Sequence, residues 1–342
     1  MRDLIRKLSL LPGVSGNEAP VHAFIKEELK DDCTFLTDRL GNLIAFKKGK
    51  EASPVKWVIA AHMDEVGFIV TYLEEDGLLR FTTVGGIDER VIIGRTVLVG
   101  EKGIPGVIGT KAVHMQSAEE RKQVMKVSEL FIDIGAKDKK EAEEVVRPGD
   151  TVVFESAFRE FGDGFIKGKA LDDRAGCAIL IKLAKMPLRY DTYFAFTVQE
   201  EVGARGAKTA AYSIDPDAAI VVDVTTAADV GGTKESQKVC KAGEGPVLSF
   251  MDRATSYDRR ALHALKDIAK EKGLKSQLKL GVYGGNDAGS IHVSRGGVRT
   301  LAVSLPGRYI HSASCVLKYS DMEDTLALLK AACDQQRAIF GE

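Results

Sequence analysis

Two adjacent glutamates, Glu200 and Glu201, follow the apolar run Thr192–Val198 and precede a turn at Gly203. The run holds aromatic and β-branched residues with one alanine, which predicts a buried strand of a parallel sheet. Open α/β sheets bind ligands at the carboxyl ends of such strands. Because neighbouring side chains point in different directions, one carboxylate could bind a metal ion while the other reaches a water on that ion. A glutamate pair after a strand is more often a solvated loop, so other residues must decide.

Three further polar residues lie at or just after apolar segments: His62, Asp223 and His311. Asp172 directly precedes a segment that is predicted to be a buried helix. Together with Glu201 these residues supply two imidazoles and three carboxylates at one edge of one sheet. Such a set fits a site for two metal ions. The remaining histidines lie in helical patterns or have no identifiable partner and are interpreted as structural or left unassigned: His22, His263, His292 and His114.

A carboxylate shared by both ions would offset their repulsion at a separation of about 3.5–4 Å. Asp172 is the expected bridge. Each ion then needs one imidazole and one more carboxylate, which His62 with Asp223 and His311 with Glu201 would provide.

Two carboxylates remain for proton transfer and support. Glu200, beside an expected ligand but not itself one, is the expected general base toward the water. Asp64, two residues after His62, is expected to orient that imidazole.

Alternating apolar strands and helices must position these residues, which predicts an α/β fold with a mixed, mostly parallel sheet flanked by helices. Extended segments are expected at Thr34–Thr37, Leu43–Phe46, Trp57–Ala60, Thr192–Val198, Ala218–Val222, Gln277–Gly281 and, as the last strand, Thr300–Leu305. Helices are expected before Pro12, from a capping box of Ser15 and Glu18 to Leu29, and at Cys177–Leu183, Ala204–Ala211, Arg260–Lys272 and Ser320–Phe340.

Between Gly67 and Phe165 the pattern changes to short strand-like runs separated by glycine or proline turns, which is typical of a small β domain. The runs are Phe68–Tyr72, Leu79–Thr83, Thr96–Val99, Gly106–Ile108, Leu130–Ile134 and Thr151–Phe154, with a solvated helix expected at Lys137–Glu144. We therefore expect residues 1–66 and 166–342 to form a discontinuous catalytic domain. Residues 67–165 are expected to form an inserted, small β-barrel-like domain.

The composition is that of an ordinary globular protein, with 342 residues, 44% hydrophobic and 28% charged. A net charge of −1 gives no reason to expect a nucleic-acid or acidic-membrane partner. No apolar run approaches the ~20 residues needed to span a bilayer. The five scattered cysteines are odd in number and none lies in a CxxC pattern, which predicts reduced thiols, a cytoplasmic protein and no thiolate zinc site.

Five segments in this order resemble the TET-type metallo-aminopeptidases, a family that includes glutamyl and deblocking aminopeptidases and some proteins labelled endoglucanases. The resemblance covers essentially the whole chain, including the β insertion. The segments are Ala61-His62-Met63-Asp64-Glu65-Val66-Gly67, Leu171-Asp172-Asp173-Arg174-Ala175-Gly176, Gln199-Glu200-Glu201-Val202-Gly203, Val222-Asp223 and Ile310-His311-Ser312.

The resemblance implies a fold of the dinuclear zinc exopeptidase type and a cytosolic, zinc- or cobalt-dependent aminopeptidase that acts on short peptides with a free N-terminus. It also implies that the β insertion mediates dimerisation, with dimers often building a tetrahedral dodecamer. The family pattern places metal ligands at His62, Asp172, Glu201, Asp223 and His311, the base at Glu200 and the supporting acid at Asp64. This agrees with the assignment reached by counting charges.

Two other functions compete with this one. A glycoside hydrolase could use Glu200 or Glu201 as part of a carboxylate pair, but it would leave the two histidines without a role and its cleft with a single tryptophan, Trp57. A non-catalytic peptide-binding scaffold would need a lost ligand or base, and none is missing. The pocket for the substrate side chain is not fixed by the sequence; its candidate residues are Arg253, Tyr283 and Arg308.

Overall fold

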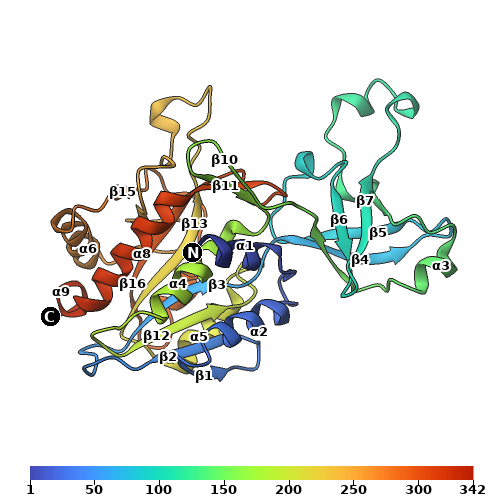
Figure 1. Cartoon of the computed structure of the whole chain (residues 1–342). Helices are drawn as coiled ribbons and strands as arrows, with labels where there is room; N and C mark the ends of the chain where they lie inside the picture. The colour runs from blue at the N-terminus through green and yellow to red at the C-terminus, as the bar shows by residue number, and fades with distance from the viewer. Residues whose placement is uncertain (342) are drawn as a thin grey trace.

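The computed structural model describes residues 1–341, so Glu342, the last residue of the expected segment 166–342, lies outside the described residues. One large mixed sheet with its helices forms the main body, and a closed six-stranded barrel stands to one side of it (Figure 1). The predicted fold class, a mixed sheet flanked by helices with an inserted small β barrel, is confirmed. The sheet was expected to be mostly parallel, but antiparallel pairs outnumber parallel ones because hairpin-like strands extend both of its sides.

The large sheet has eleven strands. Nine of them follow the order β1 (Thr34–Thr37), β2 (Leu43–Lys47), β12 (Thr192–Thr197), β3 (Trp57–His62), β13 (Ala218–Thr226), β16 (Arg299–Arg308), β17 (Cys315–Lys318), β11 (Phe165–Gly168) and β10 (Arg159–Phe161). The short strands β14 (Val247–Leu248) and β15 (Gln277–Leu278) extend the sheet beside β16.

Along the main order, parallel pairing is confined to the four central strands β12, β3, β13 and β16. Antiparallel strands extend both sides of this centre. Every residue of β3 is buried, as expected for a strand covered on both faces. The carboxyl ends of the four central strands therefore meet at one edge of the sheet.

Helix α4 (Leu171–Ala184) lies over the middle of the sheet, where it contacts β3 and β13 and separates them from α1 and α8 (Figure 1). Nearly all of its residues are buried, so its first turn is held firmly against the strand ends. The other helices of this unit are α1 (Arg2–Leu10), α2 (Ala19–Glu28), α5 (Arg205–Ile214), α6 (Arg259–Glu271), α7 (Ala288–Ile291), α8 (Tyr319–Asp334) and α9 (Gln336–Phe340).

The barrel closes in the order β4 (Gly67–Leu73), β5 (Leu79–Val84), β8 (Phe131–Asp133), β7 (Ile104–Gly109), β6 (Thr96–Val99) and β9 (Thr151–Phe154), with helix α3 (Lys139–Glu143) outside it. It has a core of its own, in which Phe68 packs edge-on against Phe81 and Phe154. The barrel ends at Phe154. Strand β10, which the predicted boundary at residue 165 placed in the insertion, pairs with β11 in the large sheet instead.

Several hydrogen bonds join the barrel unit to the main body, among them one from Asn17 Nδ2 to Thr151 Oγ1 of β9 at 2.9 Å. The backbone carbonyl of Gly86, in the loop after β5, accepts a hydrogen bond from His311. The Ser156 hydroxyl donates to the carbonyl of Ala313, a residue that packs into the barrel core.

Several element bounds differ from the sequence predictions. Strands β13 and β16 run to Thr226 and Arg308, so Asp223 lies inside its strand rather than at its end. A further strand, β17, follows the one expected to be last, and the final helix divides into α8 and α9. Polar residues within the long strands are buried against neighbouring elements, which local patterning does not register.

The predicted capping box at Ser15 and Glu18 is wrong. Glu18 precedes α2 without a side-chain cap. Its carboxylate accepts hydrogen bonds from Gly16 N and Gln199 N instead, and the Ser15 hydroxyl donates to Asp64 Oδ2 at 2.6 Å. Both side chains therefore hydrogen-bond to residues outside the predicted capping box instead of capping the helix.

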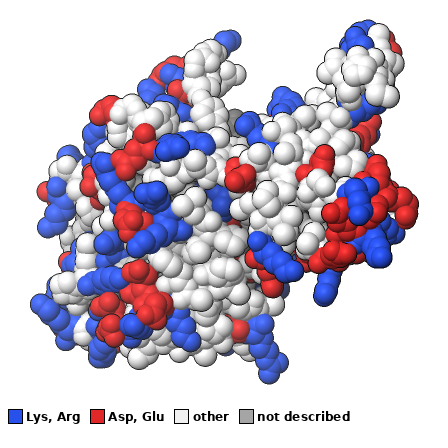
Figure 2. All heavy atoms as spheres, turned by 45° about the vertical axis from the view of Figure 1, so that its right-hand side comes forward, with Lys and Arg blue, Asp and Glu red and all other residues white. Residues whose placement is uncertain are grey.

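Positive and negative side chains are interspersed on the visible face, with no extended area of one sign (Figure 2). Among residues 1–341, no helix is both long and apolar enough to cross a bilayer.

Candidate active site

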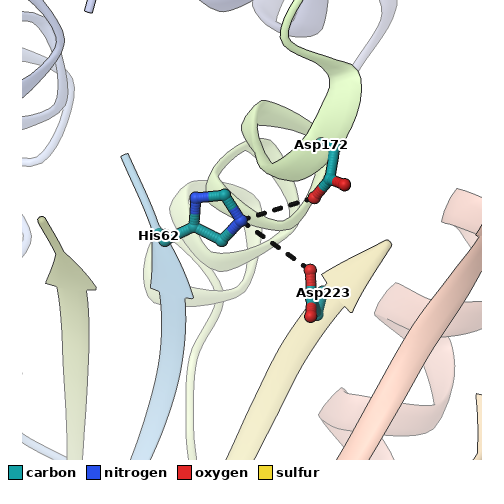
Figure 3. A group of neighbouring side chains, drawn as sticks. All are labelled: His62, Asp172 and Asp223. Atoms are coloured by element: carbon teal, nitrogen blue, oxygen red, sulfur yellow. Dashed lines mark ion pairs between the residues drawn. The ribbon is translucent and has the colours of Figure 1, made fainter. Parts of the chain in front are cut away.

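The carboxyl edge of the parallel strands gathers all the residues that the sequence singled out for metal binding. His62 is the last residue of β3, and Asp223 lies on the adjacent β13. Asp172 projects from the start of α4 toward both of them (Figure 3). Glu201 follows β12, and His311 follows β16.

These residues form two groups that share one carboxylate. In the first, His62 Nε2 lies 3.3 Å from Asp172 Oδ1 and 3.8 Å from Asp223 Oδ1. In the second, His311 Nε2 lies 3.2 Å from Glu201 Oε2 and 3.6 Å from Asp172 Oδ2. Within each group the possible ligand atoms all lie within 4.8 Å of one another. Asp172 therefore offers one oxygen to each group.

Both imidazoles turn the same nitrogen toward the shared carboxylate. His311 Nδ1 lies 2.7 Å from the Gly86 carbonyl, and His62 Nδ1 lies 3.1 Å from the Asp64 carbonyl. Because a carbonyl only accepts, each Nδ1 carries the hydrogen, and Nε2 of the neutral ring keeps its lone pair. Outer hydrogen bonds of this kind are what orient ligand histidines.

Asp64 is fully buried and links the loop after β3 to the glutamate pair after β12. Its carboxylate accepts hydrogen bonds from the backbone N–H of Glu200 at 3.0 Å and of Glu201 at 3.1 Å. Burial alone would raise the pKa of Asp64, but nearby His62 and the donated hydrogen bonds, including that from Ser15, outweigh it and lower the pKa. Asp64 thus remains a charged acceptor beneath the site.

The site holds more negative charge than its own residues can balance. Burial and nearby Asp172 raise the pKa of Glu201 to about 8 and that of Asp223 to about 6. Burial lowers the pKa of His311, but Asp172 and Glu201 outweigh it and raise the value to about 9. These groups retain protons because buried carboxylates without counter-charge are costly.

A pair of divalent cations would supply the missing charge, and the residues fit that role. Asp172 Oδ1 is buried and forms no hydrogen bond with any residue that the structure describes. Within residues 1–341 the ion-pair partners of Asp172, Glu201 and Asp223 are all histidines, never Lys or Arg. Imidazole nitrogen and carboxylate oxygen are the donors that zinc and similar ions accept.

Glu200 lines the same pocket, and no described residue hydrogen-bonds to its carboxylate. Burial, together with the negative charges of Asp223 and Asp287, raises its pKa well above the usual value. Glu200 thus places a free carboxylate with increased proton affinity beside the two ligand groups.

The pocket has a volume of about 170 Å³ and extends from the two groups past Thr225 and Val239 to Lys279 and Tyr283. Of the three residues predicted to bind the substrate side chain, Tyr283 lines it. Arg253 is exposed and lies outside the lining. Arg308 also lies outside and is bound to Asp229 through Nε at 2.6 Å and Nη2 at 2.8 Å.

Sequence reasoning missed three residues of this region. Gly86 comes from the inserted barrel and acts through its backbone, so no side-chain pattern identifies it. Lys279 lies in a short extended segment with no local signal. Asp287 is buried and receives a hydrogen bond from the Thr197 hydroxyl. Its place directly after the turn Gly284-Gly285-Asn286 was the one available hint.

A sequence model described as M42 glutamyl aminopeptidase matches residues 41–328. A candidate aminopeptidase of Acetivibrio thermocellus is 42% identical over 97% of this chain and 98% of its own length. A lysyl aminopeptidase of Pyrococcus furiosus is 31% identical over 97% of this chain and 96% of its own. A glutamyl aminopeptidase of Lactococcus lactis is also 31% identical, over 96% of this chain and 94% of its own.

Solved structures give the same result. A TET aminopeptidase from a marine-sediment Thaumarchaeota archaeon superposes with a TM-score of 0.94 at 35% identity, covering 98% of this chain and 97% of its own. The TET1 peptidase of Pyrococcus horikoshii, which can assemble into a tetrahedron or a large octahedral shell, superposes with a TM-score of 0.87 at 35% identity, covering 98% of this chain and 99% of its own.

Proposed function

The chain belongs to the M42 glutamyl aminopeptidase family, and we propose that it is a metal-dependent aminopeptidase that removes N-terminal residues from short peptides. The observation that carries this proposal is the pair of ligand groups that share Asp172. A bridging carboxylate between two imidazole–carboxylate sets suits metal-assisted hydrolysis and has no evident structural use.

In this proposal His62 and Asp223 hold one cation, His311 and Glu201 hold the other, and Asp172 binds both. When bound, the two ions, zinc or cobalt, would supply Lewis acidity toward a water and toward the scissile carbonyl. Asp64 and the Gly86 carbonyl fix the two imidazoles in the orientation that this requires.

Glu200 is the proposed general base. Its carboxylate takes a proton from the attacking water as the C–O bond forms, and gives that proton to the leaving nitrogen as the C–N bond breaks. Burial and neighbouring carboxylates increase its proton affinity. Asp64 holds the backbone of Glu200 in place.

A pocket carboxylate that holds neither proposed cation would also select the chain end. A free α-ammonium group is attracted to Glu200, whereas an internal peptide bond brings no such charge. This accounts for removal of N-terminal residues rather than cleavage within a chain.

A panel of aminoacyl-p-nitroanilides tests the function. Exhaustively chelated protein should be inactive, and activity on at least one member of the panel should return with Zn, Co or Mn. Hydrolysis of an anilide that survives complete chelation would contradict the metal dependence. The alternative glycoside hydrolase would instead cleave an oligosaccharide without added metal and leave every anilide intact. Absence of hydrolysis with every metal would favour a non-catalytic peptide-binding scaffold.

We also propose self-association through the barrel, with dimers building a dodecamer, because the Pyrococcus horikoshii TET1 peptidase can assemble into a tetrahedron or a large octahedral shell and has been solved as a dodecamer. The five cysteines are all unpaired in the structure and suit a reducing compartment, so the cytoplasm stays the predicted location.

A further inference from the structure

Among residues 1–341, Lys279 is the only lysine or arginine that lines the active-site pocket. The residue is 7% exposed, yet within the described chain its ammonium forms no ion pair. Its one hydrogen bond goes from Nζ to the backbone carbonyl of Tyr283 at 2.8 Å. An ammonium group has three donors, so two of them remain for something else in the pocket.

The other lysine buried to this degree behaves differently. Lys169 Nζ lies 2.7 Å and 3.0 Å from the two carboxylate oxygens of Glu65. Burying a charge without a counter-charge is costly, and structural buried lysines are normally paired as Lys169 is. Lys279 lacks such a partner within the protein, which points to an anion supplied by a ligand.

The position of Lys279 suits a substrate side chain. Asp223 on β13 pairs with Ser304 on β16, which pairs with Val247 on β14, which pairs with Gln277 on β15. Three strand spacings amount to about 14 Å of backbone separation. Lys279 directly extends β15, since its N–H donates to Leu248 O, and its side chain reaches back into the pocket.

The pocket wall between Asp223 and Lys279 carries both apolar and polar side chains. It presents aliphatic groups that can pack on methylenes together with hydroxyls that can hydrogen-bond, from Val224, Thr225, Thr226, Val239, Ser304 and Ile310. A short aliphatic stem that ends in a carboxylate matches both the wall and the ammonium group at its end.

We propose that Lys279 forms an anion subsite for a substrate carboxylate, which makes peptides with N-terminal glutamate or aspartate the preferred substrates; this rests on the proposed aminopeptidase function. Membership of the family does not decide the matter, because one relative is named for glutamyl and another for lysyl residues. A buried ammonium–carboxylate hydrogen bond favours acidic side chains, and like-charge repulsion disfavours lysine and arginine.

The test compares kcat/KM of the metal-loaded, full-length protein for Glu-, Asp-, Leu- and Lys-p-nitroanilide. The acidic substrates should be preferred, and Lys279→Met should lower their kcat/KM by about tenfold to a hundredfold while the Leu value stays unchanged or rises. Lys275→Met is the matched control. Lys275 Nζ also donates to one backbone carbonyl, Gly243 O at 2.7 Å, but it is exposed and lies outside the pocket lining.

Dipeptides separate the two possible sources of the carboxylate. If Lys279 binds the substrate's C-terminus instead, the wild type should prefer Leu-Ala to Leu-Ala-amide and Lys279→Met should abolish that preference, which would overturn the side-chain assignment. Equal losses on all substrates, or a wild type that prefers Leu or Lys, would also overturn it.

Calorimetry with free L-glutamate and L-leucine gives a readout that does not need turnover. Tighter binding of glutamate that is lost in Lys279→Met supports the subsite, even if no anilide is hydrolysed and the proposed function fails. Equal binding of the two amino acids by the wild type would overturn the subsite while leaving the aminopeptidase function standing.

Discussion

Asp64 Oδ1 accepts a hydrogen bond from the backbone N–H of Glu200 at 3.0 Å. The two residues come from loops that follow neighbouring parallel strands, β3 and β12. The same carboxylate lies 3.4 Å from His62 Nδ1. One buried acid thus connects a proposed metal ligand with the proposed base.

Asp64→Asn should weaken activity without unfolding the protein. The asparagine amide keeps one acceptor oxygen and replaces the other oxygen with an NH₂ group. In one orientation this NH₂ group faces the Glu201 N–H and the Ser15 hydroxyl, which donate to Asp64 in the wild type. In the other orientation it faces the Glu200 N–H. Loss of such an outer partner typically lowers activity or metal affinity by about 10- to 100-fold. Steady-state kinetics with metal analysis checks this. Asp38→Asn is the control, because Asp38 accepts three backbone hydrogen bonds in a turn away from the pocket.

Glu200→Gln should keep both metal ions yet lose most of kcat. Proton transfer by a placed side chain contributes about 10²- to 10⁴-fold. Glu201→Gln, by contrast, should lose metal, because Glu201 lies against His311 in the second ligand group. Elemental analysis alongside kinetics decides between them. Metal loss in Glu200→Gln with retention in Glu201→Gln would reverse the two roles.

Asp172→Ala should lower the occupancy of both metal sites, whereas His62→Ala should weaken mainly one. Asp172 places one oxygen near each imidazole, and His62 belongs to a single group. Titration calorimetry of the metal-free variants measures the number of sites. Two intact sites in Asp172→Ala would exclude the bridging role and make Asp173 the candidate.

The sequence predicted the fold and the candidate site correctly where an apolar run of strand length is followed by a residue that can bind a metal ion. Apolar runs such as Trp57–Ala60 predicted the central strands, and the fold class followed from their alternation with helices. The polar residues at their ends, such as His62 and Glu201, do meet at one edge because parallel strands place their carboxyl ends together.

Contacts between distant segments were beyond the sequence. Ser15 and Glu18 have the spacing of a local capping box, yet both are bound by the loops around Asp64 and Gln199. Gly86 reaches His311 across 225 positions of chain and through a backbone oxygen that every residue carries. The binding role proposed for Lys279 can be recognised only after β15 is placed beside the pocket.

Asp287→Asn should raise the melting temperature of the chelated protein at pH 8 by a few degrees and much less at pH 4–5. Burial, reinforced by Asp64 and Asp223, raises the pKa of Asp287 to about 7 in the folded state. Its unfolded value is about 3.9, so the folded protein binds more protons between these limits and loses stability as pH rises through them. Above pH 7 the penalty, on the order of a few kcal/mol, is fully present.

Scanning calorimetry at the two pH values checks this. Asp287 Oδ1 has no hydrogen-bond partner in the described part of the chain. An unpaired amide at that position therefore costs the same at either pH and cancels in the comparison. Equal shifts at both pH values would show that the charge of Asp287 is not responsible.

Removal of the barrel should leave a folded but monomeric and weakly active protein. Phe68 and Val152 are partners in the antiparallel β4–β9 ladder, so a short glycine-rich linker can replace residues 69–151. The barrel supplies none of the proposed ligands, and we propose that it carries the subunit contacts. It does supply the Gly86 carbonyl that holds His311 Nδ1, so its loss should also lower activity per folded chain by about 10- to 100-fold.

Light scattering measures the mass of both proteins with metal bound. A full-length protein that is monomeric at micromolar concentration, or a shortened one that still assembles fully, would contradict the assembly role. Undiminished activity of the shortened protein would show that His311 keeps its orientation without Gly86.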